Sequence, residues 1–229
     1  MGSGWHPSLF RAEMDALSCA SSWRLGTRTL IVETDNELVS RLTRSACIDE
    51  CLSPFGLTSE ISSIDFSLEA WLSTEPFGPP EGRSIAVRWS KMGGGMSGID
   101  GRRLAMACGG QLSDQGWAVD LETPNEEFLI CADGTSEHII WGLRMLRTTP
   151  RSGWKDRVPT ERPFFKPVSL DPRLARLALN LVDKGADTPI CDPMCGTGGV
   201  MMEASLLGIP VVGVDLDAEM VEGSRTNLD

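Results

Sequence analysis

In this 229-residue sequence, two aspartates are the side chains best suited to bind a ligand, because they lie beside glycines and apolar runs. Asp192 stands immediately before the glycine-rich segment 193–199, and Asp215 follows the apolar run 211–214. A carboxylate accepts hydrogen bonds through both oxygens and attracts positive charge. Two carboxylates beside a glycine loop therefore suit a ligand that carries hydroxyl groups and a cationic centre.

The elements predicted around these acids are a strand, a loop, a helix and a second strand. We expect them at residues 188–192, 196–199, 200–207 and 210–215. The second strand is rich in valine and should be buried. A β-α-β unit has parallel strands, and ligands bind at the carboxyl ends of such strands.

The glycine pattern argues against a dinucleotide. The G-x-G-x-x-G fingerprint is met by Gly196 and Gly198 but has Met201 at its last position. Asp192 would also repel a pyrophosphate bound at the N-terminus of the following helix. S-adenosylmethionine carries no phosphate, and its sulfonium and amino groups are positive. Asp192 is therefore expected near its methionine end, and Asp215 should accept hydrogen bonds from its ribose hydroxyls. A glycine turn that binds no ligand is the alternative.

The same residues resemble a known enzyme family. The run Asp-Pro-Met-Cys-Gly-Thr-Gly-Gly at 192–199 and the Gly-Val-Asp at 213–215 resemble the THUMP-domain tRNA guanosine N2-methyltransferases of archaeal type, which act on tRNA guanine-10. Met194 stands where that family has phenylalanine. The likeness extends over about 65 residues, including 162–164, 169–178, 220–223 and 227–228.

The resemblance implies S-adenosylmethionine as cofactor and a set of residues that contact it. Pro167 and Ser169 are expected to line the approach, and Cys195 to pack or offer its backbone rather than act as a nucleophile. The implied contacts are Asp192, Pro193, Cys195, Gly196, Thr197, Gly198, Asp215, Pro167 and Ser169.

No catalytic residue for methyl transfer is identified in the sequence. The resemblance implies an Asp-Pro-Pro-Tyr or Asn-Pro-Pro-Tyr-like motif after the fourth strand, whereas Pro79-Pro80 is followed by Glu81. An exocyclic amine is a poor nucleophile, so acceptors must hold its N–H groups in line with the methyl group. The sequence therefore predicts a methyltransferase domain that is cut short, with roughly 60 or more residues of β-α units to follow.

Composition limits the class of protein further. The chain is 41% hydrophobic, and it has neither a long apolar span nor a signal-peptide pattern, which favours a cytoplasmic protein away from membranes. Seven cysteines, with Cys47 and Cys51 spaced for one helix face, and only two histidines predict reduced thiols and no metal site. Cys191 is expected to be buried in its strand.

Basic residues are concentrated between 144 and 176, although the chain carries a net charge of −11. Such a belt can steer RNA to one face of an acidic protein, and Trp154 within it could stack on a base. A solvated linker is the alternative. The candidate RNA-binding residues are Arg144, Arg147, Arg151, Lys155, Arg157, Arg162 and Lys166.

The expected fold class is α/β, in three parts. Residues 1–147 are predicted to hold a ferredoxin-like unit and a THUMP module, a region that grips the tRNA acceptor end in the family. Residues 148–168 form a basic, proline-rich linker. Residues 169–229 begin a Rossmann-like methyltransferase domain. The elements expected upstream are helices at 12–17, 36–46 and 100–112 and strands at 29–33, 84–90, 117–121 and 127–132, with Glu13 and Asp15 as solvated helix charges.

Together these features and the resemblance predict an S-adenosylmethionine-dependent tRNA methyltransferase that modifies the N2 amine of guanosine. Position 10 of the tRNA is the target that the resemblance implies. The resemblance implies tRNA as the partner and, in some relatives, a small zinc-containing activator protein. Two alternatives stay open. One is a non-catalytic RNA-binding protein that keeps only the cofactor loop, and the other is an amino-methyltransferase that acts on adenine N6 or on glutamine.

Overall fold

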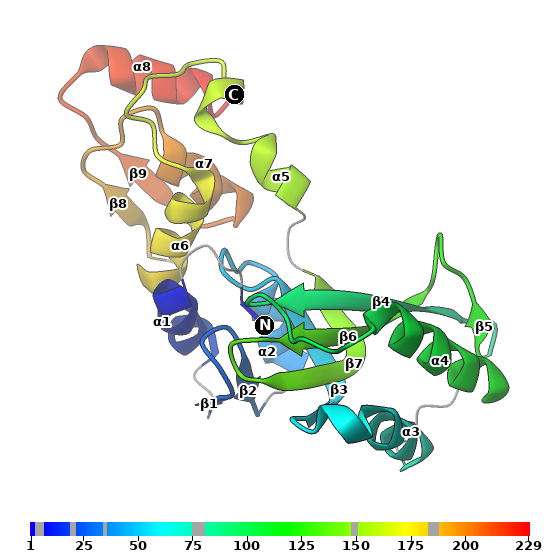
Figure 1. Ribbon diagram of the computed structural model, residues 1–229. Coiled ribbons are helices and arrows are strands. Elements are labelled where there is room, and N and C mark those ends of the chain that lie inside the picture. The colour runs from blue at the N-terminus through cyan, green and yellow to red at the C-terminus, as the bar shows by residue number, and fades with distance from the viewer. Residues whose placement is uncertain (3–6, 19–21, 34–35, 75–80, 148–150, 183–187) are drawn as a thin grey trace. The chain divides into compact units, whose positions relative to one another are not determined.

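The computed structural model describes residues 1–2, 7–18, 22–33, 36–74, 81–147, 151–182 and 188–229. The chain divides into two compact units (Figure 1). The first consists of Met1, 22–31 and 50–146, and the second of 2–21, 32–49 and 147–229. The second unit thus takes in two segments from the range 1–147, which the sequence predicted as one region.

The first unit is built on a five-stranded sheet. Its strands lie in the order β3 (Glu50–Thr58), β7 (His138–Arg147), β6 (Glu126–Asp133), β4 (Ser84–Met92) and β5 (Ala118–Val119). β4 runs parallel to β5 and β6, while β6 and β7 are antiparallel. A separate two-stranded sheet joins β1 (Ser22–Arg24) to β2 (Leu30–Val32).

Two helices, α3 (Ile64–Thr74) and α4 (Gly101–Asp114), pack on this five-stranded sheet (Figure 1). Leu104, Cys108 and Leu112 recur every four residues along α4 and reach the core made by Phe128 and Trp141. A 3-10 turn, η1 (Ile61–Ser63), precedes α3. The predicted strands 84–90 and 127–132 and the helix 100–112 are confirmed to within two residues, and the strand predicted at 117–121 shortens to β5.

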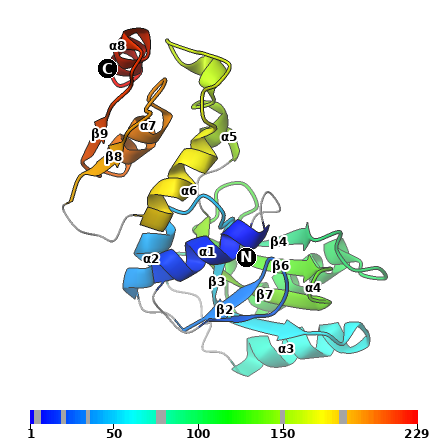
Figure 2. The ribbon, with the colours of Figure 1, turned by 90° about the vertical axis from the view of Figure 1, so that its left-hand side faces the viewer.

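The second unit contains the predicted β-α-β arrangement. Strands β8 (Ile190–Asp192) and β9 (Val211–Gly213) pair in parallel, and helix α7 (Gly199–Leu206) connects them. Helix α6 (Pro172–Val182) precedes β8, and α8 (Ala218–Thr226) follows β9. Helices α1 (Pro7–Ser18), α2 (Asn36–Leu42) and α5 (Arg151–Lys155) and the turn η2 (Pro159–Glu161) complete the unit (Figure 2).

Helix α1 packs against α6 and α2 through a stripe of buried residues. Phe10, Met14 and Leu17 have helical spacing, and Glu13 falls on the same stripe and is 0% exposed. The prediction that Glu13 is a solvated charge is therefore wrong, whereas Asp15 is exposed. Within the described ranges, no helix combines the length and the apolar character needed to span a bilayer.

The helix expected at 36–46 ends early, at Leu42. Glu13 accepts hydrogen bonds from the backbone N–H groups of Ala46 (2.7 Å) and Cys47 (2.8 Å), which are thus engaged outside any helix. Cys47 lies in the following loop and Cys51 in β3, so the prediction that these cysteines share a helix face is wrong.

Candidate cofactor site

The two acids singled out from the sequence lie at the same edge of the small sheet. β8 ends at Asp192, and Asp215 follows β9 by two residues. The pairing continues beyond the strands, because the Val214 N–H donates to the Asp192 carbonyl and the Cys195 N–H to the Val214 carbonyl, each at 2.9 Å. Parallel pairing thus brings both carboxylates to the carboxyl ends of neighbouring strands.

The loop between β8 and α7 depends on two glycines. Gly196 and Gly198 have φ values of 50° and 80°, in the left-handed region that side chains disfavour. The Gly198 N–H donates to the Cys195 carbonyl at 2.8 Å, which closes the turn before α7 begins at Gly199. Cys195 is buried and contributes its backbone to the turn, as predicted.

Asp215 is the carboxylate that joins the loop to the second strand. Its Oδ2 accepts the Gly196 N–H at 2.9 Å, and its Oδ1 accepts the Asp217 N–H at 3.0 Å. These two amides, that of Asp217 first, hold the pKa of the Asp215 carboxyl below its ordinary value. Each carboxylate oxygen has a second lone pair, so Asp215 can accept from ligand hydroxyls while it holds the loop.

Asp192 and Ser169 complete the arrangement. Asp192 Oδ1 accepts the Met194 N–H at 3.2 Å. Thr197 Oγ1 donates to Ser169 Oγ at 2.9 Å, which ties the loop to the segment before α6. Pro167 is exposed in the turn closed by the hydrogen bond from the Ser169 N–H to the Lys166 carbonyl. The structure therefore brings the predicted loop residues together with Ser169, and Pro193 lies exposed within the loop.

The strands beside the loop are less covered than predicted. Cys191 is exposed, and Val212 and Val214 are 54% and 51% exposed. Cys191 and Val212 are register partners and so lie on one face of the pair. The predictions of a buried Cys191 and a buried second strand are wrong because, in the described part of the chain, that face lacks enough packing to cover it.

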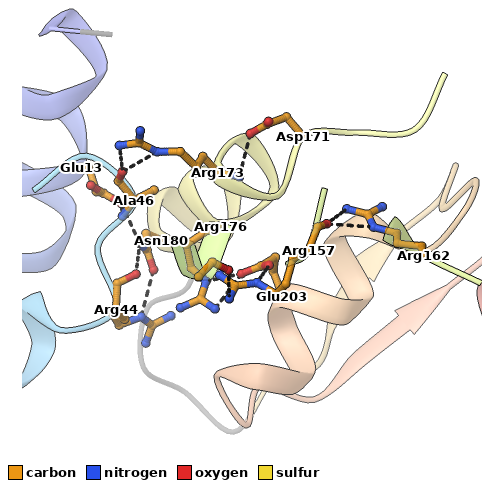
Figure 3. Close-up of polar contacts among 11 residues, drawn as sticks. Glu13, Arg44, Ala46, Arg157, Arg162, Asp171, Arg173, Arg176, Asn180 and Glu203 are labelled. Atoms are coloured by element: carbon orange, nitrogen blue, oxygen red, sulfur yellow. Dashed lines mark hydrogen bonds and ion pairs between the residues drawn. The ribbon is translucent and has the colours of Figure 1, made fainter. Parts of the chain in front are cut away.

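Three of the predicted RNA-binding arginines are engaged inside the protein. Arg162 is 7% exposed and donates to the carbonyls of Arg157 and Leu170. Arg157 Nε lies 2.8 Å from an oxygen of Glu203, which is 1% exposed (Figure 3). In the first unit, Arg144 pairs with Glu50 and Glu127. These guanidinium groups are not available to phosphates without rearrangement.

The remaining candidate basic residues differ in their surroundings. Lys155 is exposed, and Lys166 Nζ lies 2.5 Å from Glu219. The side chains of Arg147 and Arg151 lie outside the described part of the structure. Trp154 is buried, with the guanidinium of Arg157 4.7 Å and that of Arg173 5.7 Å from its ring centroid, so the prediction that it stacks on a base does not fit its position.

Sequence reasoning missed three residues that organise this unit, namely Glu13, Glu203 and Asn227. The signal for Glu203 was an isolated acid in an apolar helix, and that for Glu13 was its place in the 10, 14, 17 stripe. Asn227 hydrogen-bonds to Phe164 and Thr197, which are 63 and 30 residues away. Its sequence surroundings gave no signal of these contacts.

Comparison with known proteins identifies relatives of both the sequence and the fold. Residues 159–229 match the family described as "RMKL-like, methyltransferase domain" (UPF0020). The tRNA (guanine(10)-N2)-dimethyltransferase of Methanothermobacter thermautotrophicus is 38% identical over 155 residues, which cover 63% of this chain and 42% of the relative. The chain spans about two fifths of the length of the curated relatives it matches.

Solved structures show the same mixed α/β fold. TrmN from Thermus thermophilus superposes with a TM-score of 0.59 at 18% identity, over 98% of this chain and 66% of that one. SMU.472 complexed with SAH gives a TM-score of 0.50 at 13% identity, over 96% of this chain and 68% of that one. The chain is thus similar to the tRNA (guanine(10)-N2)-dimethyltransferases over 63% of its length, and its residues 159–229 are similar to the RMKL-like methyltransferase domain family.

Proposed function

We propose that the protein is an S-adenosylmethionine-dependent tRNA methyltransferase that methylates the N2 amine of guanosine, at position 10 of the tRNA. The observation that carries this proposal is the pair of carboxylates at adjacent strand ends beside a loop with two left-handed glycines. That arrangement occurs in a chain homologous to enzymes named for this reaction.

The residues of the loop fit S-adenosylmethionine better than a phosphate-bearing nucleotide. Asp215 has free acceptor capacity for two ribose hydroxyls, which are neutral donors. Asp192 precedes the loop and would attract the positive amino and sulfonium groups of the cofactor, whereas it would repel a phosphate at the N-terminus of α7. The complex of SMU.472 with SAH supports the same assignment at the level of the fold.

The role of these residues in the reaction is to bind and orient. Bound S-adenosylmethionine supplies an electrophilic methyl carbon. Asp215 fixes the position of the ribose, and Asp192 stabilises the charge at the methionine end. Because methyl transfer requires donor and acceptor in line, the loop conformation that Gly196 and Gly198 allow sets the position of the methyl group.

The region 1–147, with its ferredoxin-like and THUMP parts, is proposed to bind the tRNA, and residues 148–168 to link it to the methyltransferase domain. Of the basic residues, Lys155 and Lys166 are the best candidates for phosphate contacts among the described side chains, and Arg147 and Arg151 stay predictions. The small zinc-containing activator and the cytoplasmic location also stay predictions.

Methylation of matched tRNAs by the complete protein tests the proposal. A tRNA with guanosine at position 10 and the same tRNA with adenosine there are incubated with S-adenosylmethionine labelled in the methyl group, and the nucleosides are separated after digestion. We expect labelled N2-methylguanosine from the first tRNA only. Label in N6-methyladenine or in protein glutamine would favour the other amino-methyltransferases, and tRNA binding without transfer would favour the non-catalytic alternative.

A further inference from the structure

Asn227, directly after α8, connects two segments that are far apart in the sequence. Its Oδ1 accepts the Phe164 N–H, and its Nδ2 donates to the carbonyls of Phe164 and Thr197, all at 2.9 Å. Both N–H groups of the carboxamide are thus used. Phe164 belongs to residues 163–169, which we call the strap, and Thr197 belongs to the cofactor loop.

A second hydrogen bond joins the strap to the same loop residue, Thr197. Thr197 Oγ1 donates to Ser169 Oγ at 2.9 Å, and Ser169 Oγ accepts the Lys166 N–H at 3.3 Å. Thr197 is 3% exposed, so neither its hydroxyl nor its carbonyl is readily solvated if a partner is removed. The backbone and the side chain of Thr197 are therefore held from two sides, by α8 and by the strap.

The strap also lies directly on helix α8. A Cβ atom added at Gly223 would clash with Cδ1 of the Phe164 ring, so the ring occupies the space that a side chain would take. Lys166 Nζ lies 2.5 Å from Glu219 of α8, but both side chains are solvent-accessible and such a pair contributes little. The contacts made by Asn227 and Phe164 consequently fix the position of the strap on α8.

We propose that Asn227 is a positioning residue for cofactor binding, because it holds the strap and the cofactor loop in one arrangement before the cofactor arrives. This inference rests on the proposed function for the identity of the ligand. A loop that is already ordered binds without the entropic cost of ordering it. Without Asn227, the carbonyls of Thr197 and Phe164 lose their donor, and the loop must be ordered at the moment of binding.

The test uses four forms of the complete protein: wild type, Asn227→Ala, Ser169→Ala and the control Thr226→Ala. Thr226 precedes Asn227, and its hydroxyl donates within α8, to the Glu222 carbonyl at 3.1 Å. S-adenosylhomocysteine affinity is measured by calorimetry. Amide hydrogen exchange of residues 163–169 and 196–199 is measured without ligand, and thermal unfolding shows that each form is folded.

We expect Asn227→Ala to weaken S-adenosylhomocysteine binding at least tenfold and to speed exchange in both the strap and the loop. Ser169→Ala should weaken the binding by about threefold, since it breaks one of the two sets of hydrogen bonds that hold the loop. Thr226→Ala should bind and exchange like the wild type. An Asn227→Ala protein that is folded and binds like the wild type would overturn the proposal. If that variant does not fold, an unchanged affinity and exchange in Ser169→Ala overturns it instead.

The outcome also separates this inference from the proposed function. If the wild type does not bind S-adenosylhomocysteine, the proposed cofactor is contradicted, and the exchange data still test whether Asn227 holds the strap and the loop together. Faster exchange in both segments on loss of Asn227 then supports the connection between them, and unchanged exchange overturns it.

Discussion

The second unit contains two pairs of acidic residues with different surroundings. One pair is placed to stabilise the fold, and the other is placed to bind a ligand. Glu13 and Glu203 are 0% and 1% exposed, and protein donors take up their oxygens (Figure 3). Asp192 and Asp215 are only half-buried, and backbone N–H groups donate to them.

The difference follows from the cost of burying a charge. A carboxylate removed from water is tolerated only if donors or positive charges replace the water. Glu203 has Arg157 and Arg176, and Glu13 has Ser45 Oγ, two backbone N–H groups and Asn180 Nδ2 at 2.5 to 2.8 Å. The partly exposed pair keeps free acceptor capacity, which is what a ligand needs. Glu13 and Glu203 should therefore determine the stability of the fold, and Asp192 and Asp215 should determine the affinity for the ligand.

Replacement of Glu203 is expected to have the largest effect on stability. Glu203→Ala leaves the largely buried guanidinium groups of Arg157 and Arg176 without their counter-charge, which should reduce the free energy of unfolding by about 4 kcal/mol. Denaturant titration measures the change. Glu222→Ala is the matched control, because its ion pair with Arg225 is exposed and should contribute less than about 0.5 kcal/mol. Equal effects of the two substitutions would refute the distinction.

Glu13→Ala should cost about 3 kcal/mol, since several buried donors lose their acceptor together. The control lies on the same helix, where Asp15 is exposed and 3.6 Å from Arg11. Asp15→Ala should change the free energy of unfolding by less than about 0.5 kcal/mol. If Glu13→Ala lowers the free energy of unfolding by less than about 1 kcal/mol in the same titration, the hydrogen bonds of Glu13 do not hold α1 against α6.

Asp215→Ala should weaken S-adenosylhomocysteine binding at least 100-fold, because the ribose hydroxyls lose their acceptor, while the protein stays folded. Asp217 provides the control two residues away: its side chain caps α8 by accepting the Glu219 N–H at 2.8 Å. Asp217→Ala should cost about 1 kcal/mol of stability and leave the affinity within about threefold. Calorimetry and thermal unfolding measure the two quantities. A reversed pattern would move the binding role from Asp215 to Asp217.

The smallest expected effect is on the pH dependence of binding. The amides of Asp217 and Gly196 lower the pKa of Asp215. The carboxylate therefore stays ionised at every pH above the ordinary pKa of an aspartate. The affinity for S-adenosylhomocysteine should therefore be constant from pH 7 to 5 and fall only as the pH drops through the lowered pKa. Titrations at pH 7, 6 and 5 check this. A loss of affinity between pH 7 and 5 would mean that another group controls binding.

The β-α-β unit and the grouping of its acids could be predicted because their determinants are local. Glycines at 196 and 198, the acid before them and the valines at 211–214 lie within a short stretch, and parallel pairing fixes which ends meet. Helix α6 also begins at a local signal, because Asp171 Oδ1 accepts the Arg173 N–H at 2.8 Å.

What the sequence did not predict depends on partners far along the chain. Glu13 meets Asn180 across 167 residues, and Glu203 meets Arg157 across 46. The local charge pattern predicted a solvated Glu13 and gave no prediction for Glu203 or Asn180. The basic segment was consequently read as a surface for RNA, although Arg157, Arg162 and Arg173 make hydrogen bonds within the second unit.

The central claim is that the two strand-end carboxylates select a nucleoside that carries a positive amino group and no phosphate. Calorimetric titration of the complete protein with S-adenosylhomocysteine, with S-adenosylmethionine and with a dinucleotide tests it most directly. The account predicts saturable binding of the first two ligands at one site and no detectable binding of the dinucleotide. Tight binding of the dinucleotide, or no binding of either sulfur nucleoside, would contradict it.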